Sequence, residues 1–166
     1  MLILSPFFEL VEITNMPLYK LILKTIFTAL LCYFPIQNNL AQKKTKVMIT
    51  STADQTQQPC YVILPRGYEK SDNVDKIPLL ISLHSWSAGL EQAKPVLEKQ
   101  AAKLGWIYMF PHFRGPNQTP AACGSELAQQ DILDAVVWAK QNYRVDHSRV
   151  YLTGASGGGH MTMLMV

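Results

Sequence analysis

The sequence predicts an α/β fold in which a mostly parallel sheet carries helices on both faces. Short, nearly continuous apolar runs alternate with segments whose apolar residues recur at helical spacing. That alternation is typical of β-α-β units. The last apolar run leads at once into the glycine-rich segment GASGGG, which predicts a tight turn from a strand into a helix.

The composition fits one folded domain, or part of a larger one. The chain has 166 residues, of which 48% are hydrophobic and 16% are charged, so the apolar material suffices for one core. The net charge of +3 is scattered along the chain, whereas nucleic-acid binders concentrate positive charge on one face. We therefore expect no nucleic-acid partner. Three cysteines and no CxxC or HExxH spacing argue against a disulfide scaffold and a structural zinc site.

Residues 1–41 have the features of a secretory signal. Lys20 and Lys24 precede a short apolar run, and a polar segment ending in Ala41 follows. The run is shorter than the roughly 20 residues that span a bilayer, so we expect no stable membrane span. We expect Met16 to be the start, with the preceding residues an upstream extension, and the mature protein to be secreted or periplasmic. An anchored or amphipathic N-terminal helix is the alternative.

The first elements of the domain are two short strands. Lys46–Thr52 alternates weakly and is rich in β-branched residues, and Cys60–Leu64 is apolar. A polar loop ending in Pro59 separates them, which predicts a β-hairpin. The charged segment 69–76 predicts a surface loop.

The middle of the chain predicts two buried strands around a helix. Pro78–Leu83 and Trp106–Phe110 are nearly continuous apolar runs, as expected for strands covered on both faces. Between them, Pro95–Leu104 has a helical apolar face, a proline in its first turn and Gly105 as its stop. A long loop, 111–124, comes next.

The last part of the chain predicts helix, strand and helix. Ser125 can cap a helix whose apolar stripe consists of Ala128, Ile132, Ala135, Val136 and Ala139. Asn142–Ser148 reads as a connector and Arg149–Thr153 as a strand. A helix starts at Ser156 and contains three methionines that we expect in the core. The chain ends within that helix, so we expect a domain truncated after the turn.

The turn into that helix fits the G-x-S-x-G pattern of a nucleophile elbow. Ser156 would sit on a strained turn at the carboxyl edge of the sheet, and Gly154 and Gly158 would let strand and helix approach closely. Two alternatives remain open. The turn could be a tight connection without chemistry. It could also be a nucleotide-binding TGxxxGxG turn, although His160 stands where the last glycine is needed.

The loop after the third strand, HSWSAG, would supply the second oxyanion donor. The N–H groups of Trp86 and Gly157 are the candidate pair. Ser85 occupies the place of the usual first glycine. His84 is expected to hold this loop rather than to act as a base, because the triad order along the chain is serine, acid, histidine.

Four blocks resemble the prolyl oligopeptidase family of serine hydrolases, a branch of the α/β hydrolases. They read YVILPRGY, LLISLHSWSAG, FPHFRGPNQTPAACGSELAQQDILDAVVWA and YRVDHSRVYLTGASGGGHM. The resemblance covers residues 46–166 and implies an α/β-hydrolase fold, with 42–166 as the N-terminal part of the catalytic domain. It implies that Ser156 is the nucleophile. The family's acid and histidine follow the nucleophile, and neither is present here, so we expect this chain alone to be inactive.

The expected activity is cleavage of a peptide or ester bond by a serine-type peptidase, without cofactor or metal. The substrate would be a small molecule, a peptide or a carbohydrate ester. The alternatives are a carbohydrate esterase of the feruloyl or acetylxylan type, and an inactive fragment or pseudo-hydrolase that acts as a binding module.

Several other residues receive structural predictions. Arg114 is expected to brace the long loop by pairing with Asp131, and Trp138 to pack in the core. In the α/β-hydrolase fold the second strand pairs with the fourth, which could bring Cys60 and Cys123 to one sheet edge, so a disulfide between them is a hypothesis. His112 and His147 are expected to be plain surface residues.

Overall fold

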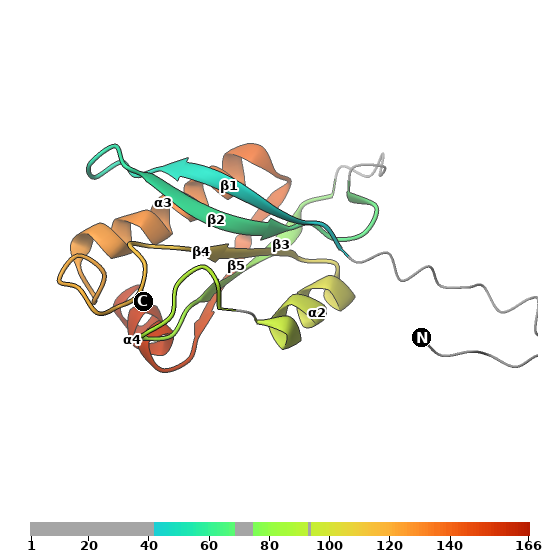
Figure 1. Cartoon of the computed structure of the whole chain (residues 1–166). Coiled ribbons are helices and arrows are strands. Elements are labelled where there is room, and N and C mark those ends of the chain that lie inside the picture. The colour runs from blue at the N-terminus through green and yellow to red at the C-terminus, as the bar shows by residue number, and fades with distance from the viewer. Residues whose placement is uncertain (1–41, 69–74, 93) are drawn as a thin grey trace, which may run out of the picture. The chain divides into compact units, whose positions relative to one another are not determined.

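The computed structural model describes residues 42–68, 75–92 and 94–166, so the predicted signal lies outside the described residues. The described strands form one five-stranded sheet in the order β1-β2-β4-β3-β5 (Figure 1). The strands are β1 (Lys44–Thr50), β2 (Gln57–Ile63), β3 (Ile77–Leu83), β4 (Ile107–Pro111) and β5 (Val145–Gly154). The helices are α2 (Pro95–Leu104), α3 (Glu126–Asn142) and α4 (Gly157–Leu164).

The sheet is mixed. β1 and β2 pair antiparallel, which confirms the predicted hairpin, and β2 pairs antiparallel with β4. β3 lies between β4 and β5 and is parallel to both. Parallel neighbours need crossover connections, and α2 and α3 provide them. The carboxyl ends of β3, β4 and β5 therefore meet at one edge, and Ser156 follows the end of β5 there.

Helices cover both faces of the sheet, as predicted. Along β4, Ile107 and Met109 belong to one buried cluster and Tyr108 and Phe110 to another. Successive side chains on a strand point to opposite faces, so the two clusters lie on opposite faces. The first cluster contains the apolar face of α3, and the second contains Ala101 of α2.

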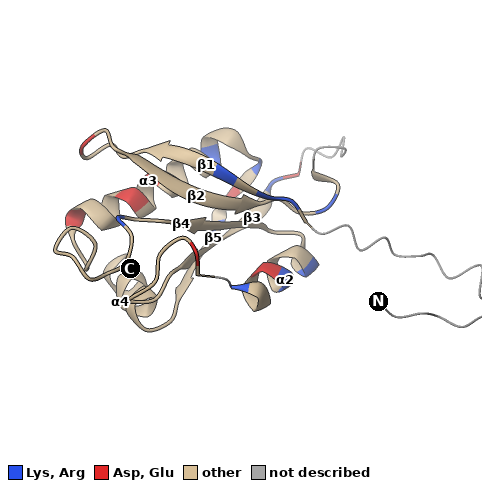
Figure 2. Ribbon diagram, in the orientation of Figure 1, with Lys and Arg blue, Asp and Glu red and all other residues tan. Residues whose placement is uncertain are grey.

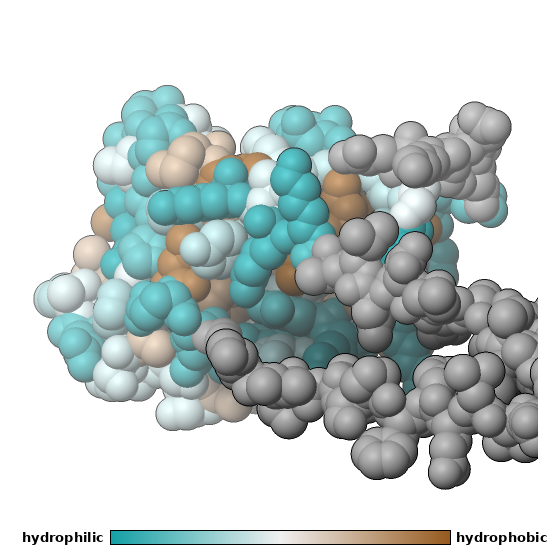
Figure 3. Space-filling model, turned by 45° about the vertical axis from the view of Figure 1, so that its right-hand side comes forward, coloured by the Kyte–Doolittle hydropathy of each residue, from teal (hydrophilic) through white to brown (hydrophobic). Residues whose placement is uncertain are grey.

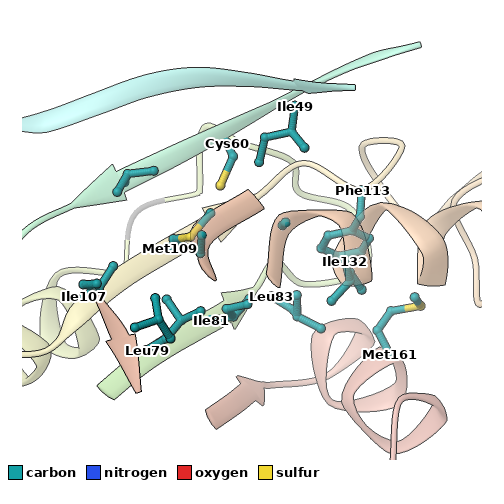
Figure 4. Close-up of a cluster of buried hydrophobic side chains, with 14 of the residues drawn as sticks. Ile49, Cys60, Leu79, Ile81, Leu83, Ile107, Met109, Phe113, Ile132 and Met161 are labelled. Atoms are coloured by element: carbon teal, nitrogen blue, oxygen red, sulfur yellow. The ribbon is translucent and has the colours of Figure 1, made fainter. Parts of the chain in front are cut away.

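The larger cluster, drawn in Figure 4, joins the hairpin, the parallel strands and two helices. Ile49 of β1, Ile132 of α3 and Met161 of α4 all lie in it. Of the three methionines at 161, 163 and 165, Met161 is fully buried, Met165 is partly buried just after α4, and Met163 is 76% exposed. The expectation of a methionine core is therefore wrong for Met163. Trp138 packs against this cluster, as predicted.

Helix boundaries follow the predicted signals closely. α2 occupies the predicted range and ends at Gly105, whose φ of 71° is in the left-handed region that favours glycine. Ser125 caps α3 by accepting a hydrogen bond from Ala128 N at 3.0 Å.

β5 begins earlier than expected, at Val145, inside the segment predicted as a connector. Val145 pairs with Ile77, and the register then shifts before Leu79 pairs with Val150. The intervening DHSR segment is polar and carries no strand periodicity. The side chain of Asp146 accepts hydrogen bonds from Ser148 N and Oγ, which stabilises the irregularity locally.

The hypothesised disulfide between Cys60 and Cys123 is not formed. Cys60 and Cys123 are both free thiols. β2 and β4 do pair as expected, and Cys60 lies opposite Pro111. However, the Cys60 side chain is fully buried in the core cluster (Figure 4), whereas Cys123 is partly exposed in the loop before α3. Burial raises the pKa of the Cys60 thiol to about 12.

The surface of the described residues is mixed in charge and polarity. Positive and negative residues are interspersed in the view of Figure 2. On the part of the face in Figure 3 that is not grey, apolar residues alternate with polar ones. Among the described residues, no helix combines the length and apolar character that a membrane crossing requires.

Candidate active site

Ser156 lies between the end of β5 and the start of α4 and is exposed. Its φ is 55° and its ψ is −122°, a region that residues with a Cβ rarely adopt and that costs roughly 1–3 kcal/mol. A tight connection alone has no need of such strain. A strained, exposed serine between a strand and a helix is the geometry of a nucleophile elbow.

Two flanking glycines make this turn possible. A Cβ on Gly154 would lie 2.3 Å from the carbonyl carbon and oxygen of Gly158. A Cβ on Gly158 would lie 2.6 Å from Leu83 O. Both obstacles are backbone atoms, which cannot turn aside as a flexible side chain can. The close approach of β5, α4 and the end of β3 therefore requires glycine at both positions, as the sequence predicts.

The absence of a side chain at Gly157 lets the loop after β3, which contains Trp86, contact the elbow. A Cβ on Gly157 would lie 2.6 Å from Trp86 N, so the two backbones touch. Within the described part of the chain, neither Trp86 N nor Gly157 N donates a hydrogen bond. Gly157 also opens α4, where the helix dipole favours negative charge. The structure therefore brings Ser156, Gly157 and Trp86 together, with two free N–H groups beside the serine.

The loop that carries Trp86 is tied down at Ser85. Ser85 N donates to Gln92 Oε1 at 2.9 Å, and Gln92 Nε2 donates to Ser85 Oγ at 3.2 Å. The serine that replaces the usual glycine is thus part of the loop's own hydrogen bonding. The Trp86 side chain remains 44% exposed.

His84 has the structural role that the sequence predicts. It is fully buried and stacks on Phe113, with ring centroids 3.9 Å apart and an interplanar angle of 4°. Its Nε2 lies 2.8 Å from His112 O and its Nδ1 lies 3.1 Å from Ser85 O. It therefore joins the loop after β3 to the loop after β4.

The loop after β4 has a strained backbone that Arg114 braces. Phe113, Arg114 and Gly115 have φ values of 33°, 73° and 81° in succession. Arg114 Nε donates to Asp131 Oδ2 at 2.7 Å, and its Nη1 donates to Asp54 Oδ2 at 2.6 Å. The predicted bracing is confirmed, and the hairpin turn proves to be a second anchor. The Arg114 hydrogen bond holds the pKa of Asp54 well below its ordinary value, with a smaller contribution from Thr56.

Asn117, in the same loop, was not predicted as a site residue. It is fully buried, its backbone N donates to Trp86 O at 2.7 Å, and its Nδ2 donates to Gly157 O at 3.4 Å. Its Oδ1 has no hydrogen-bond partner among the described residues. In the sequence it is one polar residue of a loop rich in Pro and Gly, and such residues ordinarily mark turns. Only the fold reveals that it lies behind the elbow.

None of the four histidines in the sequence forms a hydrogen bond with Ser156 Oγ in the described structure. His160 is exposed on α4, where its backbone N donates to Ser156 O at 2.9 Å. His147 is exposed near the start of β5. His112 is not a plain surface residue, because its Nδ1 is buried without a hydrogen-bond partner in the described chain, and burial lowers its pKa. Among the described residues, no group of three or more His, Cys, Asp or Glu side chains could hold a metal ion.

Comparison with protein families gives one match. A model described as the prolyl oligopeptidase family matches residues 97–166, which extend from α2 to α4 and include the elbow. No curated protein matches the chain.

Solved structures share the fold at low sequence identity. Oligopeptidase B from Leishmania major is 18% identical with a TM-score of 0.58, and the match covers 72% of this chain and 17% of that one. Acylaminoacyl peptidase from Pyrococcus horikoshii is 22% identical with a TM-score of 0.59, and the match covers 74% and 20%. S-formylglutathione hydrolase from Staphylococcus aureus is 18% identical with a TM-score of 0.58, and the match covers 74% and 50%.

The matched part spans half or less of each of these proteins. Structural similarity at such low sequence identity shows the fold alone. The family match concerns the sequence itself and covers the segment that contains the elbow. Residues 97–166 are therefore similar to the prolyl oligopeptidase family, and the described residues have the α/β-hydrolase fold.

Proposed function

We propose that the protein hydrolyses a peptide or ester bond by acyl transfer through Ser156. The observation that carries the proposal is the strained Ser156 backbone, with φ 55°, beside the free N–H groups of Trp86 and Gly157. Strain is retained at functional sites because the surroundings enforce it. Here Gly154 and Gly158 allow the backbone contacts that enforce it.

In the proposed reaction, Ser156 Oγ attacks the carbonyl carbon of the substrate and forms a C–O bond. The carbonyl oxygen becomes an oxyanion and accepts hydrogen bonds from Trp86 N and Gly157 N. A histidine takes the serine proton and passes it to the leaving amine or alcohol as the scissile bond breaks. Water then attacks the acyl-enzyme and releases the acid, and the proton returns to Ser156.

We propose that the histidine and its carboxylate partner come from residues that follow Val166. A serine hydroxyl is a weak nucleophile without an adjacent base, and the geometry of the four histidines here favours none of them. The 166-residue chain therefore carries the nucleophile and the oxyanion donors but depends on further residues for the general base.

A fluorophosphonate probe tests this proposal, because it reacts only with an activated serine. We expect labelling of a chain that extends through the acid and the histidine, loss of that labelling in Ser156→Ala, and no labelling of the 166-residue chain. Mass spectrometry of the labelled peptide identifies the site. Rapid labelling of the 166-residue chain at Ser156 would show that one of its own histidines is the base.

Substrate preference is a separate measurement on the extended chain. The family match favours a peptidase, whereas the likeness to S-formylglutathione hydrolase, covering half of that protein, favours an esterase. Comparing kcat/KM for a peptide anilide and a p-nitrophenyl ester decides between them. An extended chain that the fluorophosphonate does not label and that hydrolyses neither substrate would be a binding module on a hydrolase scaffold.

A further inference from the structure

A buried asparagine lies directly behind the two proposed oxyanion donors. Asn117 contacts the carbonyl oxygen of both donor residues, Trp86 O through its backbone N at 2.7 Å and Gly157 O through its Nδ2 at 3.4 Å. Gly157 is the first residue of α4, and in a helix the N–H and C=O groups point toward opposite ends. Holding the Gly157 carbonyl from behind therefore leaves its N–H directed toward the site.

Asn117 provides hydrogen bonds that link the two donor loops. Trp86 and Gly157 touch through their backbones, yet no hydrogen bond joins these two residues to each other within the described structure. Their separation consequently depends on packing and on the residue that bonds to both.

The loop that carries Asn117 is held in place from the other side. Its left-handed residues at 113–115 are fixed by the ion pairs of Arg114 with Asp131 and Asp54. Gly115 N also donates to His112 O at 2.9 Å. A strained loop that is anchored so firmly can set the position of a side chain well.

The Oδ1 atom of Asn117 argues against a purely stabilising role for this residue. Its Oδ1 is buried and has no hydrogen-bond partner among the described residues. A buried acceptor without a partner destabilises the fold, and a leucine of similar shape would avoid that penalty. The amide is therefore better explained by the single bond that Nδ2 makes to Gly157.

We propose that Asn117 is a positioning residue that sets the separation of the Trp86 and Gly157 N–H groups in the oxyanion hole. The inference rests on the proposed function, because the oxyanion forms only if Ser156 attacks a carbonyl. Asn117 does not touch the substrate, since it is fully buried.

The first test is Asn117→Leu in the chain that extends through the acid and histidine, with a p-nitrophenyl ester as substrate. Removing an oxyanion donor outright costs a hundredfold or more, so misplacing one should lower kcat by about tenfold. KM should change little, because the oxyanion is absent from the ground state. Activity is normalised to the fraction of Ser156 that a fluorophosphonate can titrate, so loss of folded protein does not count.

The matched control is Thr52→Val. It removes the bonds from Thr52 Oγ1 to Asp134, 2.9 Å and 3.1 Å long, which join the turn between β1 and β2 to α3. We expect it to lower the melting temperature and to leave kcat per active site unchanged.

The second test is the pH profile of Asn117→Asp. Burial raises the pKa of a carboxyl group, so at low pH the new side chain is protonated and can donate to Gly157 O as the amide does. As the pH rises and the carboxyl ionises, the donor is lost. The ratio of variant to wild-type kcat should therefore fall with rising pH, and this readout remains if the leucine variant fails to fold.

The outcomes separate the two proposals. If wild type shows neither hydrolysis nor labelling, the proposed function is wrong and the inference falls with it. If wild type is active while Asn117→Leu keeps full kcat per titrated site, only the role of Asn117 is wrong. A pH-independent ratio for Asn117→Asp would contradict it as well.

Discussion

At the scale of single residues, the elbow depends on positions where no side chain fits. Gly154 differs from Gly67 in the reason that glycine is needed. At Gly154 a Cβ would meet the backbone of Gly158 at 2.3 Å, whereas at Gly67 nothing lies within 4 Å and the only requirement is a φ of +76°. Comparing Gly154 with Gly67 therefore distinguishes the cost of a steric clash from the cost of a left-handed backbone conformation.

Gly154→Ala should therefore destabilise the fold by about 3 kcal/mol, the upper range for overpacking against a fixed neighbour. Gly67→Ala should cost about 1 kcal/mol, the penalty for a left-handed residue with a Cβ. Chemical unfolding of both variants measures the difference. Equal losses would mean that β5 and α4 can move apart at Gly154, contrary to the close packing described above.

At the same scale, the sequence was a good guide to residues whose chemistry is local. The elbow glycines and the cap at Ser125 follow from the backbone conformations that these residue types allow. Asn117 and the buried position of His112 were missed, because their roles come from contacts with residues far away in the sequence. The strand that contains Cys60 and its pairing with β4 were predicted correctly. However, the Cys60 side chain points into the core and not toward Cys123, so no disulfide forms.

At the scale of elements, one arginine joins three of them. Arg114 in the loop after β4 reaches Asp131 on α3 and Asp54 in the hairpin turn, and its Nη2 donates to Ser51 Oγ at 2.9 Å. The Asp131 side chain is 1% exposed, so its charge depends on this partner. The hairpin, the loop and α3 are thus fixed relative to the elbow through one guanidinium group.

Arg114→Gln should lower the free energy of unfolding by about 3 kcal/mol at neutral pH, since it leaves the buried Asp131 carboxylate without its counter-charge. Urea unfolding measures this. Val137→Gln on the exposed face of α3, at a side chain that is 50% exposed, serves as a control and should change stability little. A loss no larger than the control's would show that Asp131 is stabilised by other groups.

The pair with Asp54 adds a dependence on acid. The pKa of Asp54 is held below its ordinary value of 3.8 in the folded state. Its stabilising contribution is therefore complete above about pH 3.8 and is lost as the pH falls toward the folded pKa. Unfolding measured between about pH 5 and pH 2 should show a shallower loss of stability for Asp54→Asn than for wild type. Parallel curves would contradict the pairing.

Elements were predictable where a periodic apolar pattern or a cap marked them. The start of β5 was missed because the DHSR segment has no such pattern and becomes a strand only through pairing with β3. The order of the strands was implied by the family resemblance, since local patterns carry no information on which strands become neighbours.

At the scale of the whole molecule, export is a proposal that rests on residues 1–41. Lys20, Lys24 and the apolar run that follows are the features of a signal. We predict that the mature protein begins near Gln42, as measured by mass spectrometry of the exported product. Lys20→Glu with Lys24→Glu should reduce processing, because the basic region is lost. An intact N-terminus on a cytoplasmic product would contradict the proposal.

The strand order also governs when the sheet can be completed. β3 is the central parallel strand, yet both of its neighbours, β4 and β5, lie after it in the chain. A ribosome that adds roughly 5–20 residues each second needs several seconds to pass from β3 to the end of β5. Until β4 has been made, the apolar PLLISL run of β3 has no parallel strand to pair with, and its other edge stays open until β5 is complete. Of the two edges of β3, the one that β5 covers is therefore the last to be protected.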